Sequence, residues 1–175
     1  SSSSAASDVY KRQCQDLIPV SDQFFRDTCV DVTATMLEHM DEFWLMLPVE
    51  AAREQLLRVP ALWLTNYAHE WRLRQSIAAH IPALIPTMLL DDEDGCLITL
   101  SLLALNDPVN ALRNIGIQCV PITYRTFREH DETIADGFLS MLCDMAHAST
   151  SRQRTTFLNI VPVSYTHLTL PTKRI

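Results

Sequence analysis

The histidines of residues 14–162 are the first candidates for acid–base catalysis or metal binding, and they are widely spread: His39, His69, His80, His130 and His147. None belongs to an HExxH pair, and the chain has neither a GxSxG sequence nor a phosphate-binding P-loop. His80 falls beside an apolar stripe, which favours a packing or helix-surface role over metal binding. His39 follows Glu38, but two potential ligands are too few for a metal site. We therefore expect no enzyme, no catalytic residue, no cofactor and no bound metal.

The cysteines are the candidates for nucleophilic or redox chemistry. They are scattered through apolar segments and never form a CxxC pair (Cys14, Cys29, Cys96, Cys119 and Cys143). Cys119 and Cys143 are the candidate nucleophiles, but neither has a local motif or a histidine partner nearby in the sequence. An odd number of scattered thiols indicates buried, reduced cysteines and a cytoplasmic or nuclear location.

A run of four acidic residues, 91–94, is the remaining candidate for binding a cation. It lacks the alternate spacing and the terminal glutamate of a calcium loop, so a solvated loop that starts a helix is the better interpretation. No apolar run is long enough to span a bilayer.

The two ends of the chain differ from its middle. Residues 1–13 are low in complexity, and residues 163–175 follow Pro162, where we expect the helical pattern to break. Both ends resemble translated adaptor sequence, so we treat them as non-native or disordered tails and 14–162 as the array, cut at both ends. Ordinary disordered tails are the alternative.

The charge of the middle argues against two classes of partner. Residues 14–162 hold ten arginines, twenty acidic residues and no lysine. A net charge near −10 disfavours nucleic acid, whose phosphates need basic residues, and disfavours anionic membranes. A protein partner remains. The apolar fraction is 47%, enough for a substantial core.

One local pattern recurs at a spacing of about forty residues. It appears at 70–74, 107–113 and 151–154, and each time it follows one apolar segment and opens another. Arg113 follows Arg74 by 39 positions, and Arg154 follows Arg113 by 41. A fainter copy is expected at Arg26. A fixed period in this range is typical of helical repeat arrays, which usually bind other proteins.

Apolar spacing indicates that each period holds two helices. After each arginine the apolar residues recur at helical spacing, and 54–64, 96–105 and 133–146 give the preceding helices. Asp107 and Pro108 predict a helix start, with Asp107 as N-cap and Pro108 at the first position. A residue of 149–151 can cap the last second helix. The three prolines Pro82, Pro86 and Pro121 predict kinks or ends.

The segment Trp71 to Pro82 resembles the second helix of a HEAT repeat, and more closely those of the scaffold and regulatory subunits of type 2A and type 4 serine/threonine phosphatases. Asp107-Pro108-Val109 with Arg113 is similar to the turn and second-helix arginine of that family. The resemblance covers about 24–161. The aspartate that precedes the arginine in the family is replaced by Glu70 in one copy and is absent before Arg154.

The resemblance implies an all-α, right-handed α-solenoid of about four HEAT-like antiparallel helix pairs. It also implies a scaffold or regulatory subunit that binds a serine/threonine phosphatase catalytic subunit or its substrate. The family binds partners through the turns within each pair, which here gives the expected partner-binding residues Trp71, Arg72, His69, Asn110 and Arg152. For Trp71, packing against a neighbouring repeat is the alternative. A generic HEAT adaptor for tubulin or transport cargo is the alternative function, and an enzyme of unknown class is a more distant one.

Overall fold

The computed structural model describes residues 17–89 and 95–169, and within these ranges the chain is helical and has no strand. This confirms the all-α class. Residues 1–13, Cys14 and the acidic run 91–94 lie outside the described residues. The chain divides into two compact units, Ser1–His80 and Ile81–Ile175. No described helix is both long and apolar enough to cross a membrane.

The helices of the first unit are short. A helix over residues 17–25 precedes the others, which are α2 (Val30–Glu38), α3 (Met40–Met46), α4 (Val49–Leu56), α5 (Val59–Leu64) and the start of α6 (Trp71–Met88). The single helix expected over 54–64 is wrong, because two turn residues separate α4 from α5. Pro60 explains the break: it lies in the first turn of α5 and has no N–H for a continuous helix.

The core of the first unit is aromatic. Trp44 is 1% exposed and its ring lies 6.4 Å from that of Phe25. Tyr67, also buried, donates its hydroxyl hydrogen to the carbonyl oxygen of Phe25. This bond ties the loop before α6 to the end of the first helix, residues far apart in the sequence.

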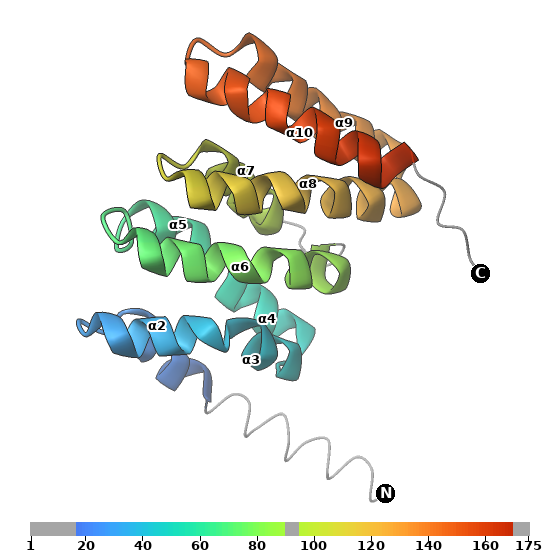
Figure 1. The fold of residues 1–175 in the computed structure, drawn as a ribbon. Helices are drawn as coiled ribbons and strands as arrows, with labels where there is room; N and C mark the ends of the chain where they lie inside the picture. The colour runs from blue at the N-terminus through green and yellow to red at the C-terminus, as the bar shows by residue number, and fades with distance from the viewer. Residues whose placement is uncertain (1–16, 90–94, 170–175) are drawn as a thin grey trace, which may run out of the picture. The chain divides into compact units, whose positions relative to one another are not determined.

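The second unit is built around a long central helix. Its elements are the end of α6, then α7 (Cys96–Asn106), α8 (Asn110–His130), α9 (Glu132–Asp144), a short 3₁₀ helix η2 (Met145–His147) and α10 (Ser151–Thr169). The expected helices over 96–105 and 133–146 are therefore confirmed. α8 contacts α7, α9 and α10, and the turns before α8 and α10 lie at the same end of the unit (Figure 1).

Contact between α7 and α8 depends on one glycine. A Cβ atom at Gly116 would lie 2.8 Å from the backbone nitrogen of Leu105 and 3.1 Å from the carbonyl carbon of Ala104. Only a residue without a side chain lets the two helix backbones approach this closely. Leu112, one turn earlier on α8, is fully buried.

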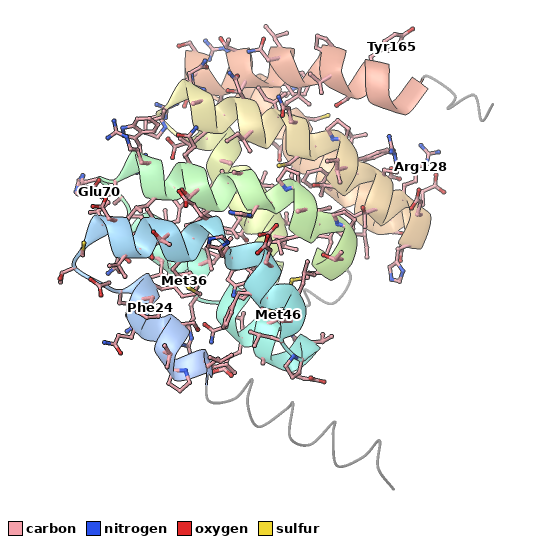
Figure 2. The ribbon with its side chains drawn as sticks, turned by 60° about the horizontal axis from the view of Figure 1, so that its bottom comes forward. Phe24, Met36, Met46, Glu70, Arg128 and Tyr165 are labelled. Carbon is pink, nitrogen blue, oxygen red and sulfur yellow. The ribbon has the colours of Figure 1, made fainter. Side chains whose placement is uncertain are left out.

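Prolines lie inside the long helices and end none of them. Pro82 and Pro86 are inside α6, Pro121 is inside α8, and Pro162 is inside α10. The expectation that the helix breaks after Pro162 is wrong, because α10 continues to Thr169. The Tyr165 side chain, in the segment expected to be a tail, is 70% exposed and projects from α10 (Figure 2).

Three of these prolines recur with the same spacing as the arginines, and this spacing can be read from the sequence. Pro82, Pro121 and Pro162 each come eight positions after the arginine of their own helix. The proline position is therefore a shared feature of the three helices, at which the helix has one fewer backbone donor.

The starts of the second helices differ in chemistry. The expectation that Asp107 is the N-cap of α8 is wrong, because the helix starts at Asn110 and Val109 is its N-cap. The Asp107 carboxylate instead accepts from the Val109 N–H at 2.8 Å, an aspartate turn just before the helix. The expected hydroxyl cap of the last helix is confirmed, because Thr150 Oγ1 accepts from the Gln153 N–H and donates to Gln153 Oε1.

We expect the free energy of unfolding to fall at alkaline pH. Burial raises the pKa of the Cys119 thiol from 9.0 to about 12 and that of the Tyr67 hydroxyl from 10.0 to about 12. Both groups stay neutral in the folded state while they ionise in the unfolded chain. The stability they contribute is thus complete below pH 9 and is lost between pH 9 and 12. Urea unfolding at steps from pH 7 to 11.5 measures it.

Two cysteine variants identify the origin of this loss. Cys119→Ala should remove the part that begins near pH 9, whereas Cys143→Ala should leave the profile unchanged because Cys143 is exposed. A stability that stays constant from pH 8 to 11.5 would contradict the burial of both groups.

Candidate partner-binding surface

Three arginines make the same pair of hydrogen bonds at the start of three long helices. Nη1 of Arg74 donates to the carbonyl oxygens of Tyr67 and Ala68 at 2.8 and 2.6 Å. The corresponding Nη1 of Arg113 donates to Asp107 and Pro108, both at 2.8 Å. We call each such arrangement an arginine turn: one guanidinium bound to two successive carbonyls of the loop before its own helix.

The third arginine turn belongs to α10. Nη1 of Arg154 donates to the carbonyl oxygens of Ala148 and Ser149 at 2.8 and 2.9 Å. The recurrence confirms that these arginines have a structural role. Each guanidinium satisfies carbonyls that a loop cannot pair by itself, and so fixes the loop against the helix.

The fainter copy expected at Arg26 is wrong. Arg26 lies in a turn before α2 begins at Val30, and not near the start of a second helix. Thr33 takes the arginine's place: its one hydroxyl hydrogen is shared between the carbonyl oxygens of Phe24 and Asp27, which lie 3.2 and 3.3 Å from Oγ1. Arg74 follows Thr33 by 41 positions, so the period is kept while the side chain changes. A search for arginine alone could not find this copy.

The loop before α6 presents the strongest candidates for partner contact. His69 and Arg72 are exposed, and the Trp71 side chain is 37% exposed at the first position of α6. The guanidinium carbon of Arg72 lies 4.9 Å from the centre of the Trp71 ring, a cation–π arrangement that holds both groups at the surface. Figure 2 shows neighbouring Glu70 at the outer end of this loop.

The other two expected contact residues lie in the second unit, at its arginine turns. Asn110 is exposed, but its Oδ1 accepts from Arg113 Nη2 at 3.0 Å, so it also supports the turn. Arg152 is exposed near the start of α10. The two turns are joined, because Gln153 Nε2 donates to Asn106 Oδ1 at 2.8 Å. No residue pattern in the sequence indicates this link between the end of α7 and the start of α10.

His80 forms a pair with an aspartate inside the first unit. Nδ1 of His80 lies 3.0 Å from Oδ1 of Asp41, and the two side chains are 17% and 23% exposed. The position supports the packing role expected for His80. Throughout the described residues, no group of three or more histidine, cysteine or acidic side chains is placed to hold a metal ion.

No family model, no curated protein and no solved structure matches this chain. The resemblance to HEAT repeats therefore rests on the sequence motifs.

Proposed function

We propose that this chain is part of a right-handed α-solenoid of HEAT-like helix pairs that acts as a scaffold or regulatory subunit for a serine/threonine phosphatase. The arginine turn carries this proposal: the same bonds from Arg74, Arg113 and Arg154 recur at nearly constant spacing. A recurrent loop geometry is what a stack of similar helix pairs requires. The phosphatase class comes from the resemblance of Trp71–Pro82 and Asp107–Arg113.

The mechanism is positioning. The arginine turns hold their loops in one conformation, so a partner that binds them meets a preorganised surface and little ordering entropy is lost. Trp and Arg are the side chains most often found at binding hot spots, and Trp71 and Arg72 present both types together. A scaffold of this kind raises the local concentration of enzyme and substrate and leaves the phosphoryl-transfer chemistry to the partner.

Truncation of Trp71 tests the proposed surface. We expect Trp71→Ala to weaken binding to a phosphatase catalytic subunit by about 2 kcal/mol, roughly thirtyfold in Kd. Its urea midpoint should move little, because the side chain is 37% exposed. Calorimetric titration gives the affinity, and chemical unfolding gives the stability.

Two further variants bound the result. Leu45→Ala removes a more exposed apolar side chain on α3 (55% exposed) and should change neither quantity. Trp63→Ala removes a buried ring (4% exposed) and should cost about 3–5 kcal/mol of folding stability. If Trp71→Ala behaves like Trp63→Ala, with unchanged affinity of the folded fraction, Trp71 belongs to the core.

If the wild-type chain binds tubulin or a transport receptor and no phosphatase, the generic adaptor is the better description.

A further inference from the structure

The last helix pair exposes apolar side chains at positions that the preceding pair buries. Counted from the arginine of each helix, Leu158 and Val161 of α10 correspond to Ile117 and Val120 of α8. Leu158 and Val161 are 66% and 49% exposed, whereas Ile117 and Val120 are 6% and 3% exposed. Both helices have apolar residues at these positions, but the side chains are exposed on α10 and buried on α8.

The first helix of the pair shows the same difference. With the same 41-residue offset, Met141 of α9 corresponds to Leu100 of α7. Met141 is 43% exposed and Leu100 is fully buried. At these positions, the apolar side chains of α9 and α10 are exposed to solvent, whereas the corresponding side chains of α7 and α8 are buried.

The next helices of the chain pack on the preceding pair. α8 contacts α9 and α10, and Phe127 of α8 meets Phe138 of α9 at a ring-centre distance of 5.9 Å. The side of α10 opposite the exposed stripe is already used: Thr156 and Ile160 are 2% and 4% exposed. The stripe therefore has the position and the residue types of a surface that receives another helix pair.

We propose that the surface formed by Met141, Leu158 and Val161 is the packing face for a further helix pair of this repeat type. That pair packs on α9 and α10 as α9 and α10 pack on α8. The inference does not depend on the partner assigned above, because it concerns packing between neighbouring helix pairs.

A helix pair from this chain can be used to test the proposal. Since Pro162 corresponds to Pro121, residues 122–162 appended after Pro162, in place of 163–175, add one 41-residue period in register. In this extended protein, we place a single Leu158→Cys in the first copy of α10 and measure its rate of alkylation by peptide mass spectrometry. The rate should fall about tenfold or more relative to Leu158→Cys in the original chain, because a covered thiol is inaccessible.

A neighbouring variant provides the control. Asn159 is exposed and corresponds to Gln118, which stays exposed on α8 although α8 is covered. Asn159→Cys should therefore be alkylated at the same rate in both proteins. Equal rates for Leu158→Cys in both proteins would overturn the proposal. It would also be overturned if the original chain forms a dimer by sedimentation velocity that Leu158→Asp dissociates, since a second copy would then be the occupant.

Discussion

Gly116→Ala should destabilise the second unit by about 2 kcal/mol, although alanine is the better helix former. The new Cβ would meet the backbone of α7 at 2.8 Å, and a backbone atom cannot move aside as the end of a side chain can. Overpacking of this kind costs about 1–3 kcal/mol, which outweighs a propensity gain of about 1 kcal/mol. Urea unfolding followed by circular dichroism measures the change.

Gly137→Ala is the matched control for this substitution. Gly137 also lies inside a helix, α9, but a Cβ there meets nothing within 4 Å. Its replacement should stabilise the protein by about 0.5–1 kcal/mol. Stabilisation by both substitutions would show that α7 and α8 are not in close backbone contact.

Removal of the arginine side chains should destabilise the protein in the order Arg74, Arg113, Arg154. Arg74 is 4% exposed, Arg113 is half-buried and Arg154 is exposed. A buried carbonyl that loses a charged donor stays unpaired, whereas an exposed one binds water. We expect Arg74→Ala to cost about 3 kcal/mol and Arg154→Ala less than about 1 kcal/mol, as measured from urea midpoints.

Arg72→Ala separates this effect from a general loss of charge. Arg72 lies two positions before Arg74 on the exposed side of α6, and its removal should change stability by no more than about 0.5 kcal/mol. Equal costs for all four variants would mean that the arginine turns do not hold their loops.

The repeat could be found from the sequence because it depends on residue types at fixed spacing. Arg74, Arg113 and Arg154 mark three helix starts, and the apolar residues that follow them have helical spacing. The copy at Thr33 could not be found in this way, since a hydroxyl there bonds to carbonyls of the preceding loop, as a guanidinium does elsewhere. Pattern searches recognise residue types, whereas the structure shows which side chain binds the loop before each helix.

Local boundaries depended on bonds that single residues do not specify. Asp107 can cap a helix or form an aspartate turn before one, and the sequence permits both. Pro162 on its own suggests a helix end, whereas its equivalence with Pro82 and Pro121 in the spacing indicates a position inside a helix. At the candidate surface, the exposure of Trp71 depends on how the loop 65–70 folds, and a tryptophan at a helix start is compatible with core or surface.

The most direct test of the proposed function is a titration of a type 2A phosphatase catalytic subunit with the wild-type chain. Binding is followed by calorimetry, and hydrolysis of a small aryl phosphate is followed in parallel. A scaffold that positions its partner should bind with a Kd of about 10 μM or tighter while hydrolysis of the small substrate stays unchanged. Absence of binding at about 100 μM chain would contradict the phosphatase assignment, and altered hydrolysis of the small substrate would contradict the positioning mechanism.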